Sequence, residues 1–249
     1  MMKEIDTELI KNLKSKDKST LLDAIEDLGD LEDKKCTPYL LNLLDDNLND
    51  DEIIDSVIWS LNRCAEINDL LKLLEIKNDL VILNAIDAIG RRAEKIDSSK
   101  LLPFLKSEKS EIRAITTWTL GRICADETRQ EIRDILDTDP DSEVRANAAW
   151  SLQKFGVKED ISFLEQIMSK EKDELVLYKL TDAIQALETK TNISEGEEIT
   201  YNCSNFTHLC NEISKNNINI KDNYIEIDII EAKNCEVGSV CKIKIKKIA

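Results

Sequence analysis

The stretch Ser110-Glu-Ile-Arg-Ala-Ile-Thr-Thr-Trp-Thr-Leu-Gly121 decides the fold, because its second half returns along the chain at regular intervals. The copies of this phrase are Ala24-Ile-Glu-Asp-Leu-Gly29, Val57-Ile-Trp-Ser-Leu-Asn62, Ala85-Ile-Asp-Ala-Ile-Gly90, Ala148-Ala-Trp-Ser-Leu-Gln153 and the weaker Leu180-Thr-Asp-Ala-Ile-Gln185. Successive copies end about 31 residues apart, a period typical of repeat architectures. Each interval has room for two short helices and two tight turns.

Each phrase belongs to one amphipathic helix, called helix B here. Four phrases are preceded by a β-branched residue, and small or apolar residues follow it at helical spacing: Ile53, Val81, Ile112 and Val144. Residues that favour helix starts recur in phase with them. The sequence therefore predicts N-caps at four positions: Asp51, Asp79, Ser110 and Ser142.

A second apolar run precedes each helix B and predicts a partner helix A, as in Leu40-Leu-Asn-Leu-Leu44 and Leu101-Leu-Pro-Phe-Leu105. Each repeat is then a helical hairpin. Because one hairpin cannot bury its apolar side alone, neighbouring hairpins must stack and share a core. The sequence predicts a mainly α protein, an α-α superhelix of about six helical hairpins over residues 1–190.

Two copies carry a family resemblance: Ser110-Glu-Ile-Arg-Ala-Ile-Thr-Thr-Trp-Thr-Leu-Gly-Arg-Ile123 and Ser142-Glu-Val-Arg-Ala-Asn-Ala-Ala-Trp-Ser-Leu-Gln-Lys-Phe-Gly156. They resemble HEAT-like repeats of the phycobilisome-lyase type, whose pattern is an acidic or hydroxyl cap, Val-Arg, an Ala-rich helix and Leu-Gly. The resemblance covers roughly residues 4–190 and implies a HEAT-like solenoid with helix B on its concave side. It also implies that Arg113 and Arg145 tie adjacent repeats to neighbouring acids.

Composition excludes several classes of protein. The formal net charge of -16 argues against a nucleic-acid binder, because long-range attraction to phosphate needs a basic footprint. No apolar run approaches the length of a membrane span, and the first residues lack the apolar run of a secretory signal. Seven scattered Cys fit free thiols in a reducing compartment. We expect a cytoplasmic protein that binds neither nucleic acid nor membrane.

The candidate binding residues form two columns on helix B, four residues apart and therefore on one helix face. The columns are Trp59, Asp87, Trp118 and Trp150, beside Arg63, Arg91, Arg122 and Lys154. Trp and Arg are common anchors of protein interfaces, so the columns predict a strip that grips an acidic segment or helix of a partner protein. The alternative is that the rings pack between helices and the basic groups stack on them.

Residues 191–249 change periodicity and predict a small α+β domain. Tyr224–Ile230 and Val240–Lys246 alternate with period two, with acids on the polar face of the first and lysines on that of the second. These two segments predict an antiparallel hairpin with opposite charges across the ladder. A short helix at 206–215 and further strands at 198–201 and 218–220 are also expected.

The same region holds the weak metal candidates, Cys203, His208, Cys210, Cys235 and Cys241. Thiolates and imidazole are ligands for zinc or an iron-sulfur cluster, but the intervals between these residues differ from the usual ones. Part-buried thiols are the simpler account, and a redox pair of Cys235 with Cys241 is a third. We expect no bound cofactor.

The sequence argues against an enzyme, because it has no phosphate-binding Gly-rich loop, no nucleophile elbow and a single His. The functional prediction therefore depends on the strip of Trp and basic residues. The leading prediction is a non-catalytic scaffold, adaptor or assembly chaperone that binds a partner protein on the helix-B face. The alternatives are a maturation factor for a metallo- or cofactor-containing enzyme that uses the Cys-rich C-terminal unit and, by resemblance, a bilin-lyase-like enzyme.

Overall fold

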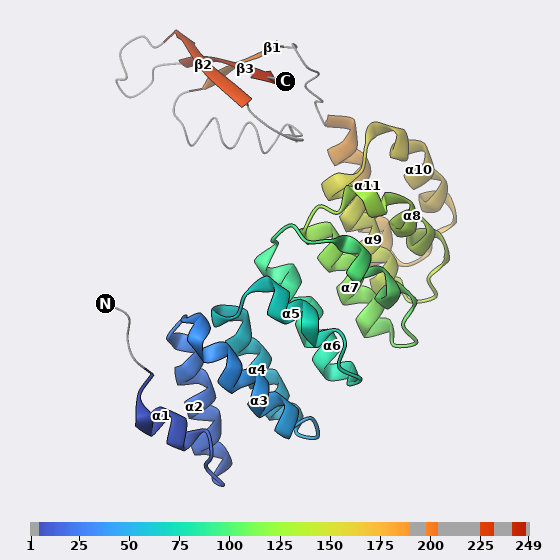
Figure 1. The fold of residues 1–249 in the computed structure, drawn as a ribbon. Helices are drawn as coiled ribbons and strands as arrows, with labels where there is room; N and C mark the ends of the chain where they lie inside the picture. Colours follow the sequence, from blue (N-terminus) through green and yellow to red (C-terminus); the bar gives the residue numbers. More distant parts are fainter. Residues whose placement is uncertain (1–4, 190–197, 204–224, 232–240, 248–249) are drawn as a thin grey trace.

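The computed structural model describes residues 5–189 together with 198–203, 225–231 and 241–247. Residues 5–189 form six helical hairpins stacked in chain order into an elongated array (Figure 1). The A helices are α1(Thr7–Asn12), α3(Thr37–Asp46), α5(Ile67–Leu73), η3(Leu102–Lys106), α8(Arg129–Thr138) and α10(Ile161–Lys170). The B helices are α2(Lys18–Asp30), α4(Asp51–Cys64), α6(Asp79–Arg92), α7(Ser110–Arg122), α9(Ser142–Phe155) and α11(Glu174–Thr189). The predicted superhelix of about six hairpins is confirmed.

The caps of the B helices lie one residue before the predicted positions, so the prediction of Asp51, Asp79, Ser110 and Ser142 was wrong. Asp50 caps α4 by accepting from the N–H of Ile53, and Asn78 and Asp141 cap α6 and α9 in the same way. At α7 the cap position is Lys109, whose side chain makes no capping bond. The four predicted residues are instead the first residues of their helices. The capping side chain belongs to the residue before, because it accepts from backbone N–H groups two or three residues further along the chain.

One predicted A helix differs in type. Between 98 and 106 the chain forms two 3-10 turns, η2(Ser98–Lys100) and η3, instead of an α-helix. Pro103 stands in this segment and has no N–H to donate, which favours a short, tight turn over a continuous α-helix. The segment still buries Leu101 and Leu105 against its neighbours and serves as the A element of the fourth hairpin.

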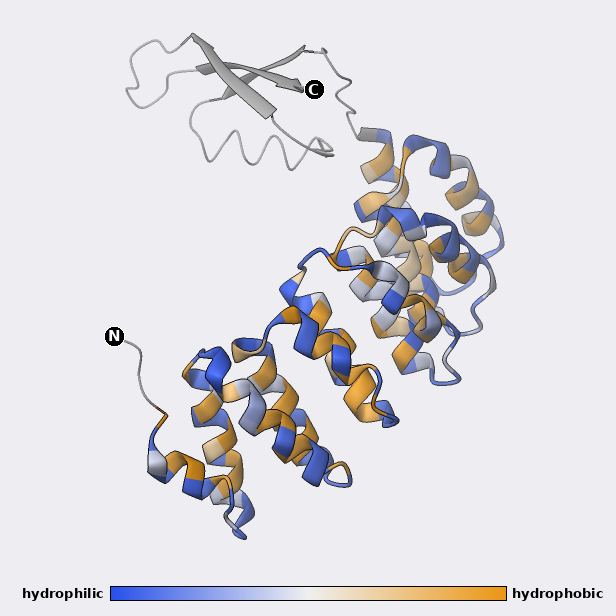
Figure 2. Ribbon diagram, in the orientation of Figure 1, coloured by the Kyte–Doolittle hydropathy of each residue, from blue (hydrophilic) through white to orange (hydrophobic). Residues whose placement is uncertain are grey.

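The core runs along the array, and the repeated B-helix positions fill it. In α9, the residues Val144, Ala148 and Leu152 are fully buried, as the spacing of four predicts. Every helix carries both hydrophobic and hydrophilic segments, so each has one inner face (Figure 2). Helix α6 joins the two halves, because Val81 and Ile89 pack with the N-terminal repeats while Ile86 packs with the C-terminal ones.

Hydroxyl groups join three of the B helices, α4, α7 and α9, to the B helix before each of them. The Oγ of Ser60 donates to the carbonyl of Ile25 at 3.0 Å, and Thr119 does the same to Ile86 at 3.0 Å. In α9, Ser151 donates to the carbonyl of Thr117 at 2.8 Å. All three bonds join residues 33 to 35 apart in the chain, so the B helices run parallel and in register.

Residues 198–247 contribute three antiparallel strands, β1(Glu198–Cys203), β2(Ile225–Glu231) and β3(Cys241–Lys247), in the order β1-β3-β2. The register sets Glu226 against Lys246 and Asp228 against Lys244. The predicted helix at 206–215 and strand at 218–220 lie outside the described residues, and the domain boundary near residue 190 stays a prediction. No helix in the described ranges has the length and apolarity needed to cross a lipid bilayer.

Candidate functional site

The eight predicted binding residues lie two to a helix on α4, α6, α7 and α9, and the structure brings most of them together. The rings of Trp118 and Trp150 stack with centroids 6.4 Å apart and planes 18° apart. The guanidinium of Arg122 lies 5.6 Å from the Trp118 ring centroid, and the ammonium of Lys154 lies 5.1 Å from that of Trp150. Each ring therefore has a cation of its own helix beside it and the other ring stacked against it.

Trp118 and Trp150 also pack within the array. A Cβ on Gly90 would lie 2.5 Å from the Trp118 ring, and a Cβ on Gly121 would lie 2.7 Å from the Trp150 ring. Each half-buried ring thus rests on the backbone of the preceding B helix, where only glycine leaves room. One part of each ring therefore packs between repeats and the other part reaches the surface, and partner binding by these residues stays a prediction.

Trp59 is different, because its side of the array stays open. The next repeat has Asp87 where α7 and α9 have tryptophan, so no second ring stacks on Trp59. Trp59 is 54% exposed, the Arg91 guanidinium lies 5.9 Å from its ring centroid, and the Arg91 Nε donates to Asp87 at 2.6 Å. Trp59 is therefore an exposed aromatic side chain held beside an ion pair.

Two hollows open on this face and share the residues Asn84, Asp87 and Arg91. One has a volume of about 410 Å³ between α4 and α6 and includes Trp59. The other has a volume of about 810 Å³ between α6, α7 and α9 and includes Ile115 and Trp118. The two hollows adjoin each other across these residues of α6, and together they are called the B-helix groove here, lined by residues of α4, α6, α7 and α9.

The four basic residues of the strip are not equally available. Arg63 binds the carboxylate of Asp30 and Arg91 binds that of Asp87. Arg122 donates only to the carbonyl of Gly90, at 3.2 Å. Within residues 5–188, neither Arg122 nor Lys154 has a carboxylate within ion-pair distance. The free positive charge of the groove edge is concentrated at the C-terminal ends of α7 and α9.

Sequence reasoning missed an acidic row on the opposite edge of the groove. Glu111 and Glu143 line the larger hollow from the first turns of α7 and α9, and Asp55 lines the smaller one. Glu111 and Glu143 are exposed and form no ion pair in the described part of the chain. The signal was present, because each stands seven residues, or two helical turns, before the tryptophan of its own helix.

The predicted inter-repeat ties of Arg113 and Arg145 are confirmed. Arg113 binds both carboxylate oxygens of Asp139, at 2.8 and 3.0 Å, and Arg145 binds both of Glu171, at 2.8 and 3.1 Å. Each guanidinium also donates to backbone carbonyls of the loop before its own helix. Hydrogen bonds from Arg145 lower the pKa of Glu171 from 4.5 to about 2. These two arginines are structural.

The cysteines divide between the two parts of the chain. Cys36 and Cys64 are buried free thiols and Cys124 is an exposed one, and burial raises the pKa of the Cys36 thiol to about 11. Among the described residues, no three His, Cys, Asp or Glu side chains gather as metal ligands would. The strand register pairs Cys203 with Cys241. His208, Cys210 and Cys235 lie outside the described residues, so zinc or iron-sulfur binding stays a prediction.

Comparison with known proteins gives one family match and several structural likenesses. The family model described as HEAT repeats matches residues 98–187. No curated protein is significantly similar to the chain. A designed armadillo repeat protein in complex with the peptide (KR)4 is 20% identical with a TM-score of 0.48, over 72% of this chain and 98% of that one.

Another solved structure is the complex of CpcE and CpcF of phycocyanin lyase from Nostoc sp. PCC7120, at 18% identity and a TM-score of 0.49, over 72% of this chain and 76% of that one. The family match covers the last three hairpins, from η2 to α11, which have the same paired helices as the rest of the array. Residues 98–187 therefore match HEAT repeats, and residues 5–189 as a whole have the fold of a HEAT-like solenoid of stacked helical hairpins.

Proposed function

We propose that this protein is a non-catalytic binding module, a scaffold, adaptor or assembly chaperone, that holds a segment of a partner protein in the B-helix groove. Repeat solenoids of this fold are typical protein-binding scaffolds, because stacked repeats offer an extended surface. The observation that carries the proposal is the open lining of the groove, with Trp59 54% exposed and two adjoining hollows lined by residues of four B helices.

The bound segment of the partner is acidic on the side that faces the C-terminal ends of α7 and α9. Arg122 and Lys154 lie on that edge and have no carboxylate partner within residues 5–188, so a partner acid can bind them without breaking an existing ion pair. Trp59, Ile115 and the exposed part of Trp118 supply apolar contact at the centre. Aromatic and arginine side chains with such an arrangement are the usual anchors of protein interfaces.

The test compares two triple variants of the full chain in capture of a partner from its own cells at low salt. Trp59→Ala, Arg122→Gln and Lys154→Glu change the groove, while Tyr39→Ala, Lys100→Gln and Lys158→Glu make matched changes on exposed residues outside it. A partner identified by mass spectrometry is then titrated against purified proteins by calorimetry. We expect the groove variant to lose at least about tenfold in affinity.

Both triple variants should keep the far-ultraviolet circular dichroism of the parent, because none of the changed side chains belongs to the buried core. Equal affinity of the groove variant and the parent would show that the partner binds elsewhere and would overturn the proposal. Equal losses in both variants would mean that charge alone, rather than the groove, holds the partner.

A further inference from the structure

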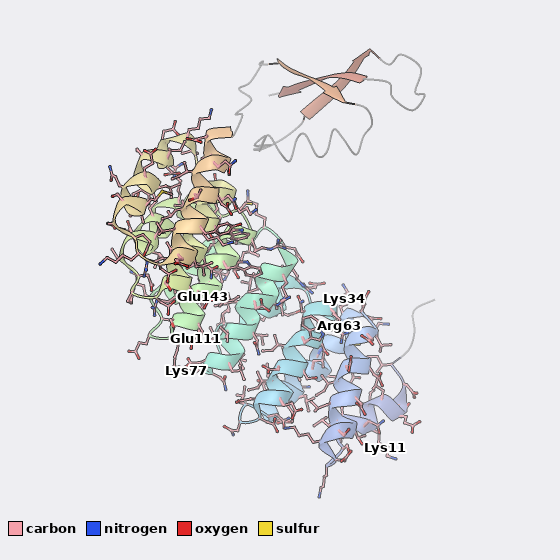
Figure 3. The ribbon with its side chains drawn as sticks, turned by 180° about the vertical axis from the view of Figure 1, so that it is seen from behind. Lys11, Lys34, Arg63, Lys77, Glu111 and Glu143 are labelled. Carbon is pink, nitrogen blue, oxygen red and sulfur yellow. The ribbon has the colours of Figure 1, made fainter. Side chains whose placement is uncertain are left out.

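The B-helix groove has charges of opposite sign along its two edges. On one edge stand Glu111 and Glu143, which Figure 3 shows next to each other on neighbouring helices. On the other edge stand Arg122, which lines the same hollow, and Lys154, which ends the neighbouring helix. The tryptophans and Ile115 lie between the two edges.

This polarity follows from the repeat itself. Helices α7 and α9 each begin with an acid in the first turn and end with a base in the last, as the helix dipole favours. They run parallel, because Asn147 donates to the carbonyl of Ala114 and Ser151 to that of Thr117, at matching heights. Parallel stacking of these two helices puts Glu111 and Glu143 on one edge of the groove and Arg122 and Lys154 on the other.

Dimensions favour a helix as the occupant. From Glu111 to Arg122 is eleven residues, which is roughly 16 Å along the helix axis at 1.5 Å per residue. A helix with its side chains is about 10–12 Å wide, so one helix laid across the B helices fills the space between the edges and reaches both. Four B helices at about 9 Å spacing span about 27 Å, the length of about 18 helical residues.

We infer that the B-helix groove binds an amphipathic helix of a partner protein that is acidic on one flank, basic on the other and apolar between them. This inference rests on the proposed function and specifies its ligand. The acidic flank lies along Arg122 and Lys154, and the basic flank lies along Glu111 and Glu143. Since neighbouring B helices are about 9 Å apart, the charges on each flank repeat about every six or seven residues.

The charge pattern also sets the direction of the bound helix. Turning the helix end to end exchanges its flanks, and would place acid against Glu111 and Glu143 and base against Arg122 and Lys154. Like charges facing each other across an interface suppress that orientation. A partner with one fixed flank pattern is therefore held in one polarity along the array.

Four synthetic helical peptides of about 20 residues test the inference on the full chain. All carry the same apolar stripe and a hydrocarbon staple on the outward face, so that their helicity is equal. The first has Glu on one flank and Lys on the other, the second Glu on both, the third Lys on both, and the fourth alternates Glu and Lys within each flank. Affinity is measured by fluorescence anisotropy.

We expect the first peptide to bind at least about tenfold more tightly than the other three, an advantage that shrinks in about 0.5 M NaCl because exposed charges are screened. In the variant Glu111→Lys with Glu143→Lys both edges become basic, and the preference should move to the peptide with Glu on both flanks. The matched pair Glu131→Lys with Glu165→Lys, exposed on α8 and α10, makes the same change of charge outside the groove and should keep the original preference.

The outcomes separate the two proposals. Equal binding of the first and fourth peptides, or tightest binding of the all-Glu peptide to the unchanged protein, overturns the two-flank inference and leaves groove binding intact. If none of the four binds better than a fifth, control peptide whose apolar stripe is replaced by Ser, the groove does not bind helices and the inference fails, while the proposed function is decided separately by the triple variants.

Discussion

At the scale of single residues, close packing decides which positions accept a side chain. Gly90 and Gly121 end two of the repeated phrases, and each lies beneath a tryptophan ring of the next B helix. Gln153 ends the equivalent phrase of α9 and is accommodated with its amide 3.5 Å from the carbonyl of Asp182. Glycine thus stands where the following repeat crowds this height, with a tryptophan ring above Gly90 and Gly121 and with Ser60 and Arg63 above Gly29.

The variant Gly121→Ala should destabilise the protein by about 1–2 kcal/mol, although alanine favours helices by about 1 kcal/mol in isolation. The added Cβ would lie 2.5 Å from the Ser151 Oγ and 2.7 Å from the Trp150 ring. Urea unfolding followed by circular dichroism measures the change. Gln153→Ala serves as the control and should be nearly neutral. A more stable Gly121→Ala variant would mean that the ring moves aside without cost.

The Glu171 carboxylate makes stability depend on pH. Its pKa falls from 4.5 to about 2 on folding, chiefly through hydrogen bonds from Arg145. Its contribution of about 2–3 kcal/mol is therefore fully present above about pH 4.5 and is lost as the pH falls towards about 2. The difference in unfolding free energy between the parent and Glu171→Gln should shrink over this window. A constant difference from pH 6 to about pH 2.5 would contradict the assigned ion pair.

At the scale of elements, the ties between hairpins are made by buried ion pairs at the loops. Arg113 and Asp139 have side chains only 12% and 3% exposed, and the pair joins α7 to the loop between α8 and α9. Removing one partner leaves an unpaired charge in a site with little water. The cost of such a change exceeds that of breaking an exposed pair.

Arg113→Met should therefore lower the unfolding free energy by about 3 kcal/mol, and adding Asp139→Leu should restore much of the loss. Lys72→Ala provides the comparison, because Lys72 is 70% exposed in its pair with Asp69 and should change stability by less than about 1 kcal/mol. Chemical denaturation of all three variants measures these differences. No recovery in the double variant would show that the arginine acts through its backbone contacts instead.

At the scale of the whole molecule, the array is held by contacts between neighbours. The core divides into an N-terminal and a C-terminal cluster that meet at α6. In an array of this kind, stability is close to a sum of repeat and nearest-neighbour contributions. A substitution at one interface between repeats should therefore destabilise the adjacent repeats more than the distant ones.

Leu120→Asp places an unpaired charge at a fully buried position between repeats and should cost several kcal/mol, of order 4 kcal/mol. Hydrogen exchange followed by mass spectrometry should show protection lost first in α7 and its neighbours α6 and α9, while α2 and α4 stay protected. Uniform loss of protection over residues 5–189 would instead mean that the array unfolds as one cooperative unit.

The sequence by itself determined the period, the six hairpins and the face of each B helix that is buried, and the family resemblance implied the roles of Arg113 and Arg145. These features depend on helical spacing and on consensus residues, which act over a few positions in the chain. The predicted caps were wrong by one residue, and the A element at 102–106 is a 3-10 helix rather than an α-helix. The repeat period locates a helix to within a residue or two, and it does not specify the backbone geometry at a helix start or near Pro103.

Only the tertiary structure decided what the groove is. Whether Trp59 is open or stacked depends on Asp87, the residue that the next repeat places at the same height 28 positions later. Likewise, Glu111 and Glu143 are ordinary first-turn acids in the sequence, and they become one charged edge only because the B helices stack parallel and in register. Spacing within a helix is a local property, whereas a groove is formed between helices about 30 residues apart in the chain.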